Sequence, residues 1–223
     1  MTASRTAEFV ARLANPTPET LAQLHDPDDI TARILRATLE QAELVGIRRI
    51  TMPDVARRSG VGRATLYRRF PNKGALIDAT VLTVARGYLD GNRQARAQGD
   101  TLEDRILFGT VFAIQFLRSN PLLRKLLRTE PETLLPSLTI EAGAIIDFAT
   151  EYSADLLRTD LYGDTPTTPQ QEHHLRTVSE LQTRLTLSFV VTPHTAIKLE
   201  NLDQAREYVR AYLMPMITGP GCR

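Results

Sequence analysis

The stretch from Gly46 to Lys73, G-I-R-R-I-T-M-P-D-V-A-R-R-S-G-V-G-R-A-T-L-Y-R-R-F-P-N-K, predicts two short helices joined by a tight turn. Thr51 and Asp54 form an S/T-x-x-D/E pair of the kind that caps a helix N-terminus. Pro53 falls in the first turn, where its missing N–H is not needed. Gly60 ends this helix, because glycine tolerates the positive φ found there. A second helix is expected from about Gly62 to Phe70, so the motif spans about residues 51–70.

The second helix is expected to present a polar arc to its surroundings. At 100° per residue, Leu66 and Phe70 fall on its inner side. The opposite arc carries Arg63, Ala64, Tyr67 and Arg68. Such side chains hydrogen-bond to base edges and phosphates, and arginine suits guanine best. A helix-turn-helix places a second helix of this kind in the major groove of DNA.

The charge of this stretch supports the same interpretation. Residues 47–73 carry eight arginines and lysines against one aspartate, in a protein whose formal net charge is +1. A solvated basic face on an ordinary helical hairpin is the alternative. Residues 27–98 have a net charge of +6 and the rest of the chain −5. The net positive charge that phosphate binding requires is therefore confined to residues 27–98.

The motif resembles the N-terminal signature of the TetR family of bacterial transcriptional repressors. The similarity covers about 50 residues, from Ile30 to near Ala79, and its core is G-V-x-x-x-T-L-Y-x-x-F-x-x-K at Gly60 to Lys73. Three positions depart from the family pattern, which often has Ser at Gly62, Gly at Ala64 and Glu at Gly74. Gly62 still caps a helix but lacks the hydroxyl that would reach a phosphate.

The resemblance implies an all-α protein of about nine helices. A three-helix DNA-binding domain with a helix-turn-helix would occupy residues 28–75, after an N-terminal extension at 1–27. A helical bundle for ligand binding and dimerisation would occupy residues 76–223. The residues expected at the DNA are Thr51, Arg63, Ala64, Thr65, Tyr67, Arg68 and Lys73. In the family, the equivalents of Tyr67 and Lys73 hold phosphates and the equivalent of Arg63 reads bases.

The rest of the chain reads as helix, without a convincing alternating strand pattern. A helix is expected at about 28–45, and a long one from 73 towards 97 joins the two domains. Further helices are expected at 100–117, 121–129, 137–161, 170–191 and 201–217. A bend is predicted at 131–136 and a loop at 163–169, both rich in proline.

Aromatic residues recur at four-residue spacings in the second half of the chain. Core packing is one interpretation, and a ligand cavity between facing helices is the other. The predicted pocket residues are Phe112, Phe116, Phe148, Tyr152, Arg184 and Phe189. Their character favours a small apolar or amphipathic ligand. A homodimer is expected through the last two long helices, with apolar residues at Leu181, Leu185, Phe189, Val209 and Leu213.

The sequence lacks the motifs that indicate several other functions. No G-x-S-x-G, Walker loop or G-x-G-x-x-G after a strand is present, so no catalytic residue, enzyme activity or cofactor is predicted. His173 and His174 point about 100° apart on a helix, and no metal site is predicted. The single Cys222 excludes an internal disulfide. With no signal peptide and no apolar run of about 18 residues, a cytoplasmic protein without a membrane partner is expected.

Three hypotheses follow. The first is a ligand-gated repressor that binds a palindromic double-stranded DNA operator as a homodimer and is released by a small molecule. The second is a DNA-binding regulator without a small-molecule inducer, either an activator or one controlled by a protein partner. The third is a helical enzyme whose basic hairpin is incidental. The sequence does not identify the ligand, the operator or the regulated genes.

Overall fold

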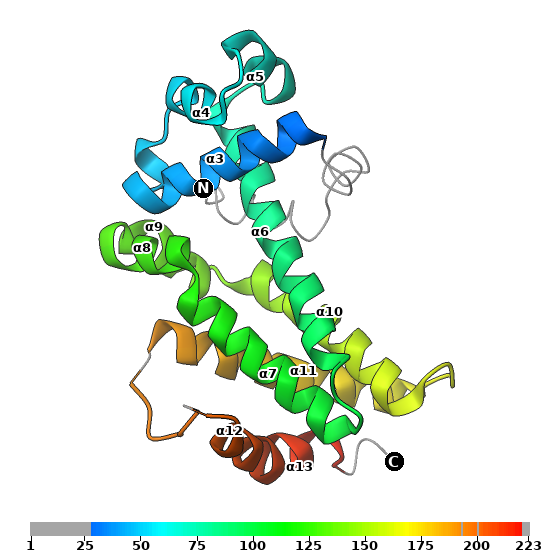
Figure 1. The fold of residues 1–223 in the computed structure, drawn as a ribbon. Helices are drawn as coiled ribbons and strands as arrows, with labels where there is room; N and C mark the ends of the chain where they lie inside the picture. The colour runs from blue at the N-terminus through cyan, green and yellow to red at the C-terminus, as the bar shows by residue number, and fades with distance from the viewer. Residues whose placement is uncertain (1–27, 193, 200, 220–223) are drawn as a thin grey trace. The chain divides into compact units, whose positions relative to one another are not determined.

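The computed structural model describes residues 28–192, 194–199 and 201–219 (Figure 1). These residues form helices, turns and bends with no strand among them, so the all-α prediction is confirmed. The N-terminal extension expected at residues 1–27 lies outside the described residues. The chain divides into two compact units. The first comprises the chain up to Leu89 together with Ser119–Ser137, and the second comprises Asp90–Arg118 and the chain from Leu138 onward.

The first unit contains the helix-turn-helix and the helices that support it. Asp28 caps its first helix by accepting a hydrogen bond from the Thr31 N–H at 2.8 Å. Gly46, at φ 85°, ends that helix. The helices of this unit are α3 (Asp29–Val45), η1 (Ile47–Arg49), α4 (Met52–Ser59), α5 (Arg63–Arg69), the first part of α6 (Lys73–Arg96), α8 (Pro121–Thr129) and α9 (Pro131–Leu138) as far as Ser137. In Figure 1, α3 to α5 run from blue to cyan.

One hydrophobic core holds the first unit together. Ile34 of α3, Val55 of α4 and Leu66 of α5 are all fully buried in it. Leu122 and Leu126 of α8 complete the same core, although they lie more than 50 residues further along the chain. Each buried side chain of this size contributes about 1.5–3 kcal/mol. The domain boundaries predicted from the sequence, residues 28–75 and 76–223, assign α8 to the bundle. In the structure, the leucines of α8 are buried in the core of the helix-turn-helix unit.

The second unit is a helical bundle with its own core. Its core includes Ile106 of α7, Leu157 of α10, Leu175 of α11 and Val209 near the C-terminus. Its elements are the end of α6, α7 (Leu102–Ser119) as far as Arg118, α10 (Gly143–Tyr162), α11 (Pro169–Val191), α12 (Leu202–Tyr208), the π-helical turn η2 (Val209–Leu213) and α13 (Met214–Ile217). α10 and α11 form a helical hairpin (Figure 1). Their contact is the most extensive between two helices of this unit.

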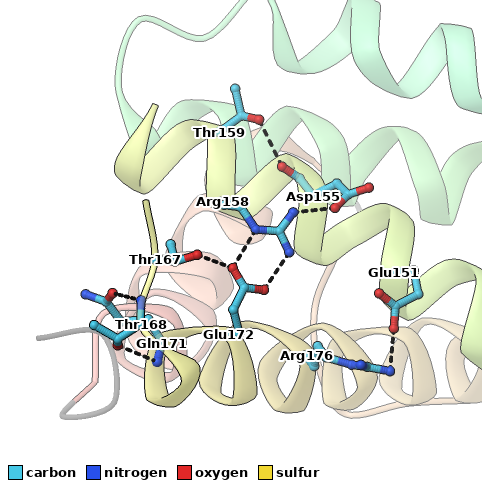
Figure 2. Close-up of polar contacts among 9 residues, drawn as sticks. All are labelled: Glu151, Asp155, Arg158, Thr159, Thr167, Thr168, Gln171, Glu172 and Arg176. Atoms are coloured by element: carbon cyan, nitrogen blue, oxygen red, sulfur yellow. Dashed lines mark hydrogen bonds and ion pairs between the residues drawn. The ribbon is translucent and has the colours of Figure 1, made fainter. Parts of the chain in front are cut away.

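Ion pairs fasten α10 to α11 at the turn between them (Figure 2). Arg158 of α10 donates from Nε and Nη2 to the two carboxylate oxygens of Glu172 on α11, both at 2.7 Å. Asp155 and Thr167 also contact this pair. The pKa of Glu172 falls to about 2, chiefly because Arg158 and then Thr167 donate hydrogen bonds to its carboxylate. The hairpin therefore carries an ionised carboxylate throughout the physiological pH range.

Two predicted elements differ from the structure. The bend predicted at residues 131–136 is the short helix α9. Pro131 is its first residue, where the missing N–H costs no intrahelical hydrogen bond. Pro136 lies near its end, where the missing N–H removes a single intrahelical hydrogen bond. The helix predicted from Ser137 begins only at Gly143, after a turn. Ile140, which the predicted helix would include, lies in this turn and is 89% exposed.

Among the described residues, no single helix is both long and apolar enough to cross a membrane. Only α7 and α8 taken together, as a bent pair, reach the required length and composition.

Candidate nucleic-acid interface

The first helix of the motif is capped at both ends. The Thr51 hydroxyl accepts from the Asp54 N–H at 3.3 Å and donates to the Asp54 carboxylate at 2.6 Å. The Asp54 carboxylate thus accepts from the Thr51 hydroxyl, whereas in a capping box it would accept from the Thr51 backbone N–H. The pKa of Asp54 is lowered, first by this hydroxyl and then by Arg57. Gly60 adopts the left-handed conformation, φ 66° and ψ 26°, so the predicted turn is confirmed.

The second helix, α5, separates its faces as its sequence predicts. Leu66 is its only fully buried residue, and Phe70 directly after it is buried as well. The outward residues are exposed, namely Arg63, Ala64, Tyr67 and Arg68, while Thr65 is half-buried. Gly62 begins α5 without a side-chain cap. The residues predicted at the DNA on α5 therefore share one accessible arc, apart from the partly covered Thr65.

The arginines of the first unit differ in what they bind. Some bind carboxylates, as in the pairs Arg48–Glu132, Arg57–Asp54, Arg58–Glu40 and Arg69–Asp28. Arg63 and Arg68 instead have no hydrogen bond or ion pair with any described residue, and both are exposed. A guanidinium without an internal partner keeps all five donors for a phosphate or a guanine. The geometry therefore directs two free cations outward from the second helix of the motif.

Lys73 lies in a different environment from these free cations. Its ammonium donates to the Arg48 carbonyl oxygen at 2.8 Å and thereby supports η1. Burial lowers the pKa of Lys73, and the nearby Glu130 carboxylate partly offsets this shift. Glu130 itself is buried over Gly46, where an added Cβ would lie 2.0 Å from its Oε1. Lys73 retains two N–H donors for the phosphate contact that remains predicted for it.

The six residues predicted to line a ligand pocket lie in several environments. The rings of Phe112 and Phe116 on α7 are 5.6 Å apart, and Phe112 also lies against Gly91. Arg93 lies 5.4 Å from the centre of the Tyr152 ring. Phe189 is buried edge-to-face against Tyr208.

Phe148 is half-buried, whereas Arg184 is exposed and pairs with Glu180 one turn earlier on α11. Among the pockets of the described part of the chain are two of a few hundred Å³. One, of about 340 Å³, is lined by Asp203, Arg206, Glu207, Arg210 and Ala211. The other, of about 400 Å³, is lined by Val45, Arg48, Arg49, Lys125, Thr129, Glu130 and Glu132. Neither includes a predicted pocket residue, so the ligand pocket stays a prediction.

Sequence reasoning missed the side chains that hold the motif in place. Arg33 of α3 donates to the Ser59 carbonyl oxygen at 2.6 Å and to that of Gly60 at 3.2 Å, across the turn of the motif. Asp28 binds Arg69 at the end of α5. Both partners lie more than 25 residues away in sequence, where helical periodicity carries no signal for a polar contact.

A capped helix, a left-handed glycine turn and a second helix with an exposed arginine arc define a helix-turn-helix DNA-binding protein. Residues 34–80 match the family described as bacterial regulatory proteins, tetR family, and residues 103–208 match the bacterial tetracyclin repressor C-terminal domain. The chain belongs to the TetR family, and it is a DNA-binding transcriptional regulator. The family is one of transcriptional regulators and not of enzymes.

Curated relatives and solved structures agree with this assignment. An uncharacterised HTH-type transcriptional regulator of Mycobacterium tuberculosis is 32% identical over 110 residues, which cover 49% of this chain and 56% of that protein. The match thus spans little more than half the length of the relative. The TetR family repressor AlkX from a Dietzia strain, implicated in biodegradation of n-alkanes, is 25% identical with a TM-score of 0.58, covering 82% of this chain and 97% of AlkX. QsdR, a TetR family repressor of R. erythropolis, shares the fold at 21% identity and a TM-score of 0.50, covering 85% and 96% of the two chains.

Proposed function

We propose that this regulator is a repressor that binds a palindromic operator as a homodimer and is released by a small, largely apolar molecule. The observation that carries the DNA-binding part is the arc of α5, where Arg63 and Arg68 are exposed and free of internal partners. Arg63 reads a base in each half-site, and Tyr67 and Lys73 bind phosphates. Thr51, Ala64, Thr65 and Arg68 complete the proposed contact surface.

The proposed dimer surface lies on the second unit. Leu181 and Leu185 are one turn apart on α11 and are 46% and 39% exposed, and Tyr212 is 63% exposed. Exposed apolar side chains of this size favour an interface. Phe189, Val209 and Leu213, also expected there, are instead buried in the core of the protomer. A two-fold dimer places two copies of α5 about one DNA turn apart, which matches a palindromic operator.

Sedimentation at micromolar concentration tests the dimer. The wild type is expected to sediment as a dimer, and Leu181→Glu with Leu185→Glu as a monomer. Leu44→Glu is the matched control, because Leu44 is also an exposed leucine at 57% but belongs to the first unit. A monomeric wild type would contradict the proposal.

The ligand is proposed to be apolar because two aromatic rings lie on α7, among its aliphatic side chains. Phe112 and Phe116 are half-buried, and their tilted rings lie against each other. Elsewhere in the second unit, Thr150 and Ser179 have buried hydroxyls without partners among the described residues. AlkX, to which the chain is similar, is implicated in n-alkane degradation. Since α6 contributes residues to both units, a ligand that shifts its second half would move its first half as well. Linkage then requires the ligand to weaken DNA binding by as much as DNA weakens ligand binding, with a coupling of about 1–3 kcal/mol.

The test measures operator affinity with and without n-alkanes and long-chain acyl compounds. A DNA duplex selected from a random library by the wild-type protein serves as the operator. Compounds that bind the bundle are expected to lower affinity, and Phe112→Trp is expected to weaken their effect by filling the site. Should every compound that binds leave operator affinity unchanged, the repressor would lack this form of gating.

A regulator without a small-molecule inducer, either an activator or one controlled by a protein partner, is the second candidate. It is favoured because neither of the two pockets described above is lined by the aromatic residues. The same titration separates the two candidates, since only the first requires a compound to change operator affinity.

A further inference from the structure

Arg69, the last residue of α5, is turned away from the arc that faces DNA. Its Nη1 donates to Asp28 Oδ1 at 2.9 Å and to the Thr31 hydroxyl at 2.5 Å, and its Nη2 donates to Asp28 Oδ2 at 2.6 Å. Its side chain is only 26% exposed, and its Nε is buried without a hydrogen-bond partner among the described residues. The neighbouring Arg68 is exposed and has no such partner.

Asp28 joins this contact to the start of α3. Its Oδ1 also accepts the Thr31 N–H, so one carboxylate caps α3 and holds α5. The pKa of Asp28 falls to about 2, first because of the Thr31 N–H and then because of Arg69. A planar guanidinium bound to both carboxylate oxygens fixes direction as well as distance.

The recognition helix needs such a constraint because its hydrophobic attachment is small. α5 has seven residues, of which only Leu66 is fully buried, and Phe70 directly after it is buried in the same core. Two buried side chains on one side of the helix set how far it lies from the core but leave its rotation about its own axis weakly determined. The Arg69–Asp28 pair attaches the C-terminal end of α5, and Arg33 holds the Ser59 and Gly60 carbonyls just before its N-terminal end.

We propose that Arg69 is a positioning residue that, through Asp28 on α3, sets the rotation of α5 and so the direction in which Arg63, Ala64 and Tyr67 meet the bases. Arg69 itself does not contact DNA. This inference rests on the proposed role of α5 as the helix that reads the operator. It gives Arg69 a structural role, whereas the neighbouring Arg68 is proposed to contact DNA.

Asp28→Asn distinguishes positioning from DNA contact by the sign of its effect. Asparagine caps a helix about as well as aspartate, so α3 keeps its cap. The variant removes only the negative charge that binds the Arg69 guanidinium. If Arg69 contacted a phosphate and Asp28 only neutralised it, removing the negative charge would strengthen binding to all DNA. If Arg69 positions α5, the same change weakens binding to the operator and leaves binding to random DNA unchanged or slightly stronger.

The experiment uses the full-length protein, the selected duplex described above and a random duplex of equal length, titrated over a range of salt concentrations. Asp28→Asn and Arg69→Gln are each expected to lower operator affinity about tenfold or more. The salt slope on the operator is expected to stay as in the wild type. Arg68→Gln is the matched control, and it is expected to reduce the slope by about 0.9 for each phosphate that the variant no longer neutralises.

Three results in the single variants would overturn the inference. One is stronger operator binding by Asp28→Asn, and another is a fall in salt slope for Arg69→Gln as large as that for Arg68→Gln. The third is unchanged operator affinity in both variants. The double variant Asp28→Arg with Arg69→Asp, which reverses the pair, is expected to recover operator affinity relative to either single reversal, and failure of a folded double variant to do so also counts against the proposal. A wild type that selects no preferred sequence would instead refute the proposed function.

Discussion

The two units use their arginines differently. In the second unit, Arg105, Arg158 and Arg206 each bind a carboxylate on another helix. Arg96 and Asp160 form a pair there that is only 11% and 12% exposed. In the first unit, Arg63 and Arg68 project from α5 without a partner among the described residues. Buried or paired guanidiniums hold helices together, whereas free ones on an exposed arc remain available to phosphates.

This difference shows that the number of basic residues alone does not locate a DNA-binding surface. The stretch 47–73 contains eight basic residues, yet Arg48, Arg57, Arg58 and Arg69 are neutralised by carboxylates. The four that remain are Arg49 of η1, Arg63 and Arg68 of α5, and Lys73 at the start of α6, so the positive charge without a carboxylate partner lies at fewer positions than composition indicates. The number of basic side chains without a carboxylate partner sets an upper limit on the phosphates that this surface can bind before an ion pair has to break.

The largest expected effect separates the inner face of α5 from its outer face. Leu66→Ala should lower the free energy of unfolding by about 2–5 kcal/mol, because Leu66 is fully buried in the core of the first unit. Tyr67→Ala, the matched control, removes a side chain that is 46% exposed and should cost less than about 1 kcal/mol. Urea denaturation measures both. Equal losses of stability in the two variants would show that α5 does not separate a structural face from a binding face.

The fold of the first unit is predictable from sequence because its signals are local. Thr51, Gly60 and Leu66 each act within one or two helical turns, through a cap, a left-handed turn and a buried face. The attachment of α8 to this core is not predictable in the same way. Leu122 and Leu126 show helical spacing, but periodicity does not reveal which distant helices they pack against.

The same limit applies to the second unit. The sequence correctly places Phe189, Val209 and Leu213 on apolar faces, but it does not show that these side chains are covered inside the protomer. Arg184 stays a predicted ligand residue, and in the structure it pairs with Glu180 on its own helix. A helix pattern identifies an apolar face, and only the tertiary structure shows what covers it.

The next effect concerns DNA binding and compares one arginine from each unit. Arg63→Ala should lower operator affinity by about 1–3 kcal/mol and relax specificity at one position of each half-site. Arg184→Ala is the matched control, because Arg184 is also exposed but pairs with Glu180 in the second unit, and it should leave operator affinity unchanged. Titration of the selected duplex and its single-base variants at fixed salt measures both. Equal losses of affinity would mean that net charge, and not the arc of α5, governs binding.

The smallest expected effect tests a paired arginine of the second unit, Arg158. Its partner Glu172 is 33% exposed, so solvent screens the pair, and Glu172→Gln should cost less than about 1 kcal/mol of stability at pH 7. The pKa of Glu172 drops from 4.5 to about 2 on folding, so its contribution is complete above pH 4.5 and disappears as the pH falls through 2. The stability difference between wild type and Glu172→Gln should therefore shrink between pH 4.5 and pH 2. Urea denaturation at several pH values measures it, with a double-mutant cycle through Arg158→Met to isolate the pair. A difference that stays constant across this range would show that the hairpin gains from the hydrogen bonds of Glu172 and not from its charge.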